Sequence, residues 1–299
     1  MCMWHVIIAL MPTTLCALYF FGLPAALTLA TSIISCVAAE WLIVRYMMGS
    51  RYKSSLVAAA LTGLLLGLNL PASIPLWTVT IGAVMAIGIG KMTFGGLGCN
   101  IFNPALVGRV FMLISFPMAM TIWPIPGSGF VADAHTGATI LSALKEGVMP
   151  DLSYGYTDLL IGNRGGSMGE VSSVAIIIGC AYLLITRVIS WHIPVSVVAT
   201  VFVFDLCLGI PAGIDILSGG LLLGAVFMAT DYVTSPMTHR GQLVYGLFIG
   251  IITVVIRRWG AYPEGVSFAI LIMNGFTPLI NRYVKPRRFG VDVRKEVAA

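Results

Sequence analysis

The residues best suited to chemistry lie in one hydrophilic stretch, where positions 133–139 have the sequence DAHTGAT. Thr139 offers a hydroxyl nucleophile, Gly137 and Ala138 leave space around that hydroxyl, and Asp133 offers a carboxylate to a metal or a docking enzyme. This D-x-x-[S/T]-G-[A/S]-T pattern predicts a modification site at Thr139. An ordinary helix cap is the alternative, because helix-forming residues follow Thr139. The spacing alone leaves both interpretations open.

A second polar group surrounds a glycine-rich turn that contains Gly95, Gly96 and Gly98 and is followed by Asn100 and Asn103. Backbone N–H groups of such a turn at a helix N-terminus can hold a flavin or an anion. The alternative is a tight turn that simply needs glycine. The turn is not a dinucleotide fingerprint, because no βαβ pattern surrounds it.

Four ionisable residues fall in or near apolar segments, where each costs several kcal/mol unless it is paired or hydrated. Glu40, Asp205 and Arg109 lie within such segments, and Asp231 lies near the end of one. They form either an ion or proton path or an Arg–carboxylate pair that joins two helices. We expect Arg109 to pair with one of the three acids, and Asp205 to be the path residue.

Metal binding is not predicted. The six cysteines form no CxxC pair, and the four histidines are isolated from other ligand types. The sequence also has no ferredoxin-like cysteine spacing and no nucleotide-binding fold.

The surrounding elements are indicated by composition. The chain is 58% hydrophobic and 10% charged, with a mean hydropathy of +0.97, whereas a soluble domain has roughly a quarter charged residues. Spans of about twenty apolar residues cross a bilayer. We therefore predict an all-α polytopic membrane protein with about ten transmembrane helices, at 4–22, 24–46, 54–70, 75–93, 100–120, 170–188, 191–209, 216–232, 241–257 and 263–281.

The distribution of Lys and Arg predicts the orientation. With the N-terminus in the cytoplasm, twelve of these residues fall on the cytoplasmic side and four on the other side, and Arg109 falls within a span. The net charge of +5 is concentrated near the C-terminus, as in a cytoplasmic membrane flank, so no nucleic-acid partner is predicted. Both termini are expected in the cytoplasm, and the connection that carries Thr139 on the outer face.

That connection divides the chain. We predict a first five-helix repeat at 1–120, an outer-face loop at 121–170, and a second five-helix repeat with a basic tail at 171–299. GLLLG occurs at 63–67 and again at 220–224. Because five spans is an odd number, the second repeat would be inverted relative to the first. The alternative is that such glycine pairs are common in any membrane helix.

Together with DAHTGAT, three further stretches carry a resemblance to a known family: KMTFGGLGCNIFNPALVGR at 91–109, ATDYVTSP at 229–236 and WGAYPEGVSFA at 259–269. The chain resembles the RnfD/NqrB family of membrane redox subunits, found in the Rnf electron-transport complex and, as a more distant likeness, in the sodium-pumping NADH:quinone reductase. The resemblance covers nearly the whole chain with the motifs in order. Thr136 stands where the family often has Ser.

The resemblance implies a subunit of a complex that passes electrons between ferredoxin and NAD and moves Na⁺ or H⁺. It implies FMN linked to Thr139 through a phosphoester by a flavin transferase, with Asp133, Thr136, Gly137 and Ala138 completing the motif. It also implies a second, noncovalent flavin, either riboflavin or FMN. We place its wall at Gly95, Gly96, Gly98, Asn100, Asn103, Thr234 and Ser235.

The implied partners are iron–sulfur and NAD-binding subunits, a second flavinylated subunit, the flavin transferase and membrane lipid. The implied location is a bacterial or archaeal cytoplasmic membrane. Whether the isolated chain is an enzyme stays open, and catalytic residues are not assigned. Two other functions compete: an inverted-repeat secondary transporter without a redox cofactor, and a structural scaffold for redox subunits.

Overall fold

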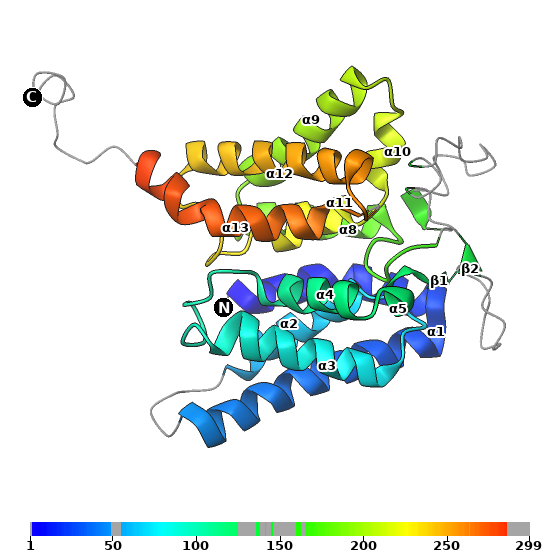
Figure 1. Ribbon diagram of the computed structural model, residues 1–299, viewed down its shortest axis with the longest axis vertical. Coiled ribbons are helices and arrows are strands. Elements are labelled where there is room, and N and C mark those ends of the chain that lie inside the picture. Colours follow the sequence, from blue (N-terminus) through cyan, green and yellow to red (C-terminus); the bar gives the residue numbers. More distant parts are fainter. Residues whose placement is uncertain are drawn as a thin grey trace, which may run out of the picture.

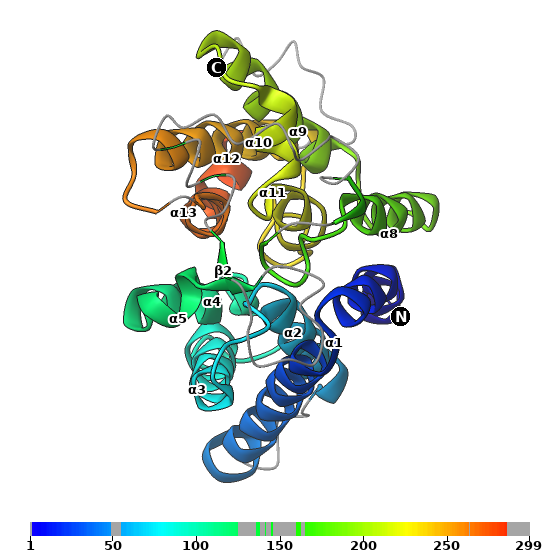
Figure 2. The ribbon, with the colours of Figure 1, turned by 90° about the vertical axis from the view of Figure 1, so that its right-hand side faces the viewer.

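The computed structural model describes residues 2–48, 55–124, 136–137, 141, 145, 160–162, 165–262 and 264–285. Within these ranges the chain is built mainly from helices, in agreement with the predicted fold class, and they run side by side across the molecule in two layers (Figure 1). The first half of the chain forms one layer and the second half forms the other, as a view turned by 90° also shows (Figure 2).

The first layer contains five α-helices and two π-helical segments among its described residues. Its elements are α1 (Cys2–Ile43), η1 (Val44–Met48), α2 (Leu56–Leu68), α3 (Leu76–Ile87), η2 (Gly88–Met92), α4 (Pro104–Ser115), α5 (Pro117–Thr121) and the short strand β1 (Trp123–Pro124).

The second layer follows the long connection. Its elements are β2 (Thr136–Gly137), α8 (Ser173–Ile185), α9 (His192–Cys207), α10 (Ala212–Leu217), α11 (Leu221–Leu223), η3 (Gly224–Met228), α12 (His239–Trp259) and α13 (Val266–Tyr283). Strand β2 pairs with β1 in antiparallel register, with Trp123 opposite Gly137 and Pro124 opposite Thr136. We call the end of the molecule with these strands the β end (Figure 1).

Helix α1 is bent into two pieces. Gly22 has φ of +61°, which is outside the helical region, and Pro24 follows it. An unbroken helix of 42 residues would be about 63 Å long, roughly twice the thickness of a hydrocarbon core. The kink at Gly22 divides α1 into two shorter helical pieces.

Glycines allow the closest helix contacts. A methyl group added at Gly63 of α2 would lie 2.7 Å from Cα of Ile33 in α1, and one added at Gly179 of α8 would overlap the Ala9 carbonyl oxygen. The hydroxyl of Ser32 also donates to the Gly63 carbonyl at 2.7 Å. Helix α1 therefore packs against both layers, through backbone approach of the kind typical of membrane helices.

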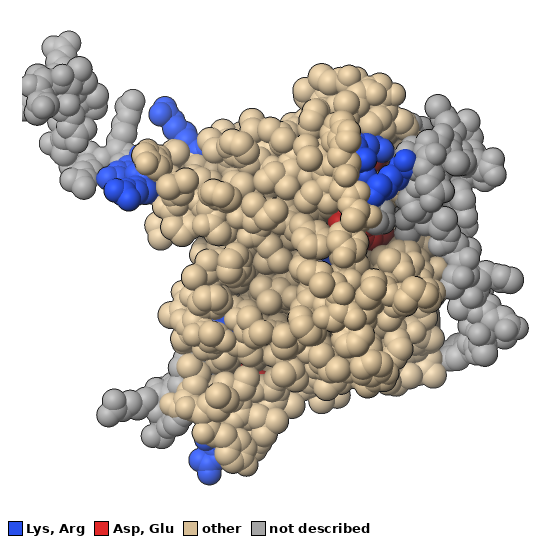
Figure 3. Space-filling view, viewed as in Figure 1, with Lys and Arg blue, Asp and Glu red and all other residues tan. Residues whose placement is uncertain are grey.

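Two described helices are long and apolar enough to cross a bilayer, the kinked Cys2–Met48 and His239–Trp259, and five shorter apolar helices have 10 to 17 residues. Helical residues occur in all ten predicted segments, but the first two segments share the kinked α1, and 216–232 holds only the end of α10, the short α11 and η3. The number of spans stays a prediction, and α5 and α10 were not predicted as separate elements. In this view most Lys and Arg lie near the two ends of the molecule, and the surface between them is largely uncharged (Figure 3). The boundaries of the three predicted regions stay predictions.

Candidate functional site

The predicted flavin-attachment motif is only partly described. Asp133, Ala138 and Thr139 lie outside the described residues, whereas Thr136 and Gly137 form strand β2. Two residues beyond Thr139, Leu141 is buried at 4% exposure and lies against Gly219, where an added methyl group would overlap its Cδ1. Described residues on either side of Thr139 are thus attached to the β end of the molecule.

Four charged side chains form what we call the arginine corner: Asp205, Asp215, Arg257 and Arg258. Nη1 of Arg257 donates to Oδ2 of Asp215 at 2.7 Å, and Nη2 of Arg258 donates to Oδ1 of the same carboxylate at 2.9 Å. Asp205 is completely buried, with Nη2 of Arg258 3.9 Å away. The predicted path residue Asp205 therefore lies within a cluster of two acids and two arginines, and its role in ion movement stays a prediction.

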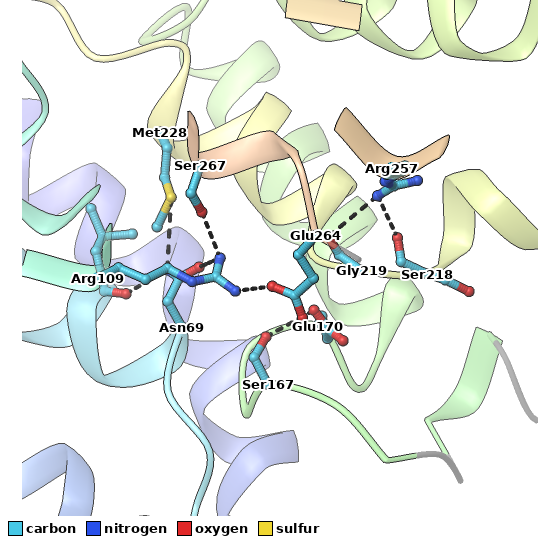
Figure 4. A network of polar contacts seen from close by, with 11 residues as sticks. Asn69, Arg109, Ser167, Glu170, Ser218, Gly219, Met228, Arg257, Glu264 and Ser267 are labelled. Carbon is cyan, nitrogen blue, oxygen red and sulfur yellow. Dashed lines mark hydrogen bonds and ion pairs between the residues drawn. The ribbon is translucent and has the colours of Figure 1, made fainter. Parts of the chain in front are cut away.

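Arg109 is the centre of a second group, the central network, which also contains Asn69, Glu264 and Ser267. Its Nη1 donates to Oδ1 of Asn69 and to the Ser267 hydroxyl, both at 2.9 Å, and its Nη2 donates to the Glu264 carboxylate (Figure 4). Asn69 follows α2, Arg109 is in α4, and the other two residues are at the start of α13. The network therefore joins the two halves of the chain.

This arrangement corrects one expectation. Among the described residues, the carboxylate partner of Arg109 is Glu264, and not one of the three acids expected for it, Glu40, Asp205 and Asp231. The physical reason is that α13 begins beside the middle of α4, and a separation of 155 residues in the sequence gives no hint of this contact. An Arg–carboxylate pair that joins two elements is nevertheless what the structure shows.

Glu40 has a different partner. Its Oε2 accepts from Nζ of Lys91 at 2.5 Å, and its Oε1 accepts from the backbone N–H of Ser55 at 2.9 Å. Both charged side chains are nearly fully buried, at 0% and 3% exposure. This second buried ion pair is far from the β end, because Lys91 is in η2, close to the opposite end of the molecule (Figure 1).

Beside this pair is a space of about 260 Å³, which we call the apolar cavity. Its wall is mostly aliphatic and comes from both halves of the chain, with polar groups at a few positions. Residues from α1, α2, η2, α4, α8 and η3 line it, including Thr62, Lys91, Asn100, Asn103, Phe227 and Asp231. Both η2 and η3 contribute, and π-helical segments are frequent at functional sites.

Asn100 and Asn103 both line the apolar cavity, and their role in a flavin wall stays a prediction. Oδ1 of Asn103 accepts from the backbone N–H of Ala105 and caps α4, while its amide nitrogen donates to the Met228 carbonyl at 3.2 Å. This residue holds η3 of the second half against the start of α4. The bond therefore connects two elements that line the cavity, one from each half of the chain.

The glycine turn needs its glycines for their backbone conformation, and its flavin-binding role stays a prediction. Gly95, Gly96 and Gly98 all have positive φ, at 107°, 91° and 82°, so the turn itself requires glycine. Gly98 and Thr234 line a second cavity of about 280 Å³. Ser235 lines a third, of about 470 Å³, which adjoins the apolar cavity at Val188, Ile189, Thr230 and Tyr232.

Asp231 also lines the apolar cavity, in the turn that follows η3. The hydroxyl of Thr234 donates to its Oδ2 at 3.2 Å, and the carboxyl also has a side-chain hydrogen bond with Asn100. Two residues that the sequence assigned to one wall therefore position this acid. In this way, the predicted wall and the predicted intramembrane acid belong to one local structure.

Comparison with known proteins adds the family. The model of the NQR2, RnfD, RnfE family matches residues 1–290. The chain belongs to this family. One relative, a subunit of the Na⁺-translocating ferredoxin:NAD⁺ oxidoreductase complex of Acetobacterium woodii, is 43% identical over 301 residues, covering 99% of this chain and 93% of the relative.

Two further relatives of the chain agree with this assignment. A subunit of the proton-translocating ferredoxin:NAD⁺ oxidoreductase complex of Clostridium ljungdahlii is 41% identical, covering 96% of this chain and 91% of the relative. A subunit of the ion-translocating oxidoreductase complex of Stutzerimonas stutzeri is 38% identical, with 98% and 92% covered. The predicted family is confirmed, and the relatives are members of multi-subunit, ion-translocating complexes.

Several members of these clusters were missed in the sequence. Lys91, Asp215 and Glu264 form three of the buried ion pairs, and Leu141 anchors the long connection. Glu264 does carry a signal, since an acid just before a long apolar run is typical of a helix N-terminus. Lys91 and Asp215 had no such signal, because their importance comes from partners far away in the sequence.

Proposed function

We propose that this chain is the flavin-carrying membrane subunit of an ion-translocating ferredoxin:NAD oxidoreductase complex, with FMN linked to Thr139. The observation that supports it most is the DAHTGAT motif at 133–139, placed in the long connection of a member of the NQR2, RnfD, RnfE family. The partners are the iron–sulfur, NAD-binding and second flavinylated subunits of the complex, together with the flavin transferase that acts on Thr139.

A covalent link suits an outer-face site. A flavin on the outer side of the membrane is not replenished from the cytoplasm, so a reversible site there would gradually empty. Bound FMN supplies a carrier that takes up and releases electrons, and the protein supplies its position and surroundings. The hydroxyl of Thr139 holds the phosphate, and the small side chains at 137 and 138 leave room for the transferase.

The apolar cavity suits a second, noncovalent flavin. A flat aromatic ring system with polar edges fits a mostly aliphatic wall with polar groups at a few positions, such as Asn100, Asn103 and Lys91. The adjoining cavity of about 470 Å³ provides room for a polar tail. Riboflavin and FMN have the same ring system, so the cavity suits either one, and the proposal includes both.

The ion moved is Na⁺ or H⁺, and the names of the relatives include both. Asp205 and Glu40 are our proposed path residues, since a buried carboxylate is the group that either cation needs. Arg109 instead joins the halves of the chain, which is consistent with its three bonds to Asn69, Ser267 and Glu264.

The proposed topology has ten spans in two inverted repeats, with both termini in the cytoplasm and 121–170 on the outer face. It is supported by the break in α1 at Gly22, which makes two passes of one helix. It is further supported by close packing at corresponding positions of the two GLLLG segments. A methyl group added at Gly67 would lie 2.9 Å from the Leu29 side chain, and one added at Gly224 would lie 2.5 Å from Val266.

The test is a comparison of Thr139→Ala with the matched variant Ser142→Ala, which removes another hydroxyl three residues away. The full complex is produced in a host that supplies the transferase, and denatured subunits are examined for flavin fluorescence and by mass spectrometry of the Thr139 peptide. We expect FMN on wild type and Ser142→Ala and none on Thr139→Ala. Wild-type protein without flavin contradicts the proposal; solute uptake by that protein indicates a transporter, and none indicates a scaffold.

A further inference from the structure

The Leu141 side chain packs where a side chain on Gly219 would otherwise be. Gly219 has φ of +68°, and an added methyl group would overlap Cδ1 of Leu141 and lie 3.0 Å from Nη2 of Arg257. Leu141 itself is only 4% exposed. Any side chain at position 219 would therefore displace Leu141. We call the contact between Leu141 and Gly219 the Gly219 seat.

The seat is fixed by Arg257, which is 2% exposed. Its Nη2 donates to the carbonyls of Ser218 and Gly219 at 3.1 and 3.3 Å. Its Nη1 donates to the carbonyl and the carboxylate of Asp215 at 2.8 and 2.7 Å. A buried guanidinium with four such bonds holds the turn against which Leu141 packs.

A second attachment lies four residues further along. Nζ of Lys145 donates to the Gly260 carbonyl at 2.5 Å, and Gly260 is the C-cap residue of α12. A cation at a helix C-terminus is favoured by the helix dipole. Leu141 and Lys145 thus connect the same segment to the turn before α11 and to the end of α12.

Described residues on both sides of the motif threonine in the sequence contact different halves of the chain. Gly137, two residues before Thr139, pairs with Trp123, which follows the first half. Leu141, two residues after Thr139, lies against Gly219 of the second half. The motif is therefore flanked in sequence by contacts with both halves at the β end.

The seat is also next to the central network. Gly220, the neighbour of Gly219, lies where an added methyl group would be 3.1 Å from Oε2 of Glu170 and 3.9 Å from Nη1 of Arg109. Figure 4 shows Gly219, Glu170, Arg109 and Arg257 in one neighbourhood. The turn that receives Leu141 is thus continuous with the polar contacts that join the two halves.

We infer that Leu141 is a positioning residue, which fixes the FMN on Thr139 at one place relative to the membrane interior and its neighbouring redox centre. This inference rests on the proposed function. The seat acts after attachment, because the transferase needs the motif itself, whereas electron transfer needs the attached flavin at a defined place.

The experiment uses the full complex and measures two quantities in each variant: covalent flavin fluorescence of the denatured protein, and the rate of electron transfer from ferredoxin to NAD. Small displacements of reacting groups change rates strongly. We expect Leu141→Ala and Gly219→Ala to keep wild-type fluorescence and to lower the rate about tenfold. Leu141→Met, which has a similar volume, should restore most of the rate.

Gly209→Ala is the matched control. Gly209 has φ of +71°, nearly that of Gly219, but an added methyl group would have no described atom within 4 Å. It therefore imposes the same backbone strain without blocking Leu141, and its rate should stay close to wild type. The pair Leu141→Ala with Gly219→Ala should be no slower than either alone, because both remove one contact.

The outcomes separate the two ideas. Wild-type protein without covalent flavin overturns the proposed function. Normal fluorescence with wild-type rates in Leu141→Ala overturns the positioning role alone, and so does an equal loss of fluorescence and rate in Leu141→Ala. Should Gly219→Ala fail to assemble, Leu141→Ala decides, because it leaves the Gly219 turn intact.

Discussion

The arginine corner at the β end and the apolar cavity near the opposite end use buried charge in different ways. In the corner, Arg257 and Arg258 share the Asp215 carboxylate and Arg257 also binds backbone carbonyls, so these contacts join α10 and the turn after it to α12. Around the cavity, the ion pair of Lys91 and Glu40 lies at the edge of an apolar space of about 260 Å³.

This difference suggests that the arginine corner is a structural scaffold and that the apolar cavity is a ligand-binding site. The bonds of Arg257 to Asp215 and to the carbonyls of Ser218 and Gly219 fix the geometry of the turn that contacts Leu141. An apolar space with a few polar groups offers burial to a ligand and orients it. We therefore expect changes in the corner to affect stability most and changes at the cavity to affect cofactor content most.

The largest effect is expected from Arg257→Met. It leaves the buried carboxylate of Asp215 with less compensation, and breaking a buried ion pair from one side costs about 3–5 kcal/mol. The unfolding midpoint of the detergent-solubilised protein measures the loss, with the exposed Arg240→Met on the same helix as the control. Equal midpoints for the two variants would contradict the assignment of the corner as a scaffold.

A smaller loss is expected from Glu40→Gln at the edge of the cavity. Lysine can lose its proton when its partner is removed, whereas arginine stays charged, so the expected cost is about 1–3 kcal/mol. The double variant Glu40→Gln with Lys91→Met should be closer to wild type than Glu40→Gln alone. A larger loss of stability in Glu40→Gln than in Arg257→Met would contradict the assignment of the arginine corner, and not the cavity, as the scaffold.

Filling the cavity should change cofactor content with little change in stability. Ala58 lines the cavity from α2, and Ala58→Phe should lower the noncovalent flavin that purifies with the protein by about tenfold, which corresponds to about 1.4 kcal/mol of binding. Leu56→Phe enlarges an exposed residue of the same helix and is the control. Unchanged noncovalent flavin in Ala58→Phe would show that this flavin binds elsewhere.

Among the three variants expected to lose stability, Thr234→Val should lose the least, because it removes one neutral donor near the cavity. The Thr234 hydroxyl is buried and donates to Asp231 at 3.2 Å, and losing such a bond costs about 1 kcal/mol. Thr80→Val is the control, because the Thr80 hydroxyl donates within its own helix at an exposed position. The unfolding midpoints of the two variants measure the difference. A loss in Thr234→Val as large as in Arg257→Met would make the cavity wall part of the scaffold.

The sequence by itself was enough to predict a mainly helical chain, a long connection between its two halves, and the family. Apolar runs of about twenty residues, GLLLG and DAHTGAT are local patterns, and local patterns report on local structure. The Asn103-Pro104 pair also marks the start of α4, because a capping asparagine before proline is a local helix signal. The role of Asn100 and Asn103 in a flavin wall stays a prediction.

Only the tertiary structure decided which buried charges meet. Arg109 with Glu264, Lys91 with Glu40, and Arg257 with Asp215 are separated by 155, 51 and 42 residues. Leu141 has no polar group and no motif, and its importance depends on the missing side chain of Gly219. Such contacts form because the packing of the two halves brings distant residues together, and the free energy of that packing is not written in any short stretch of the chain.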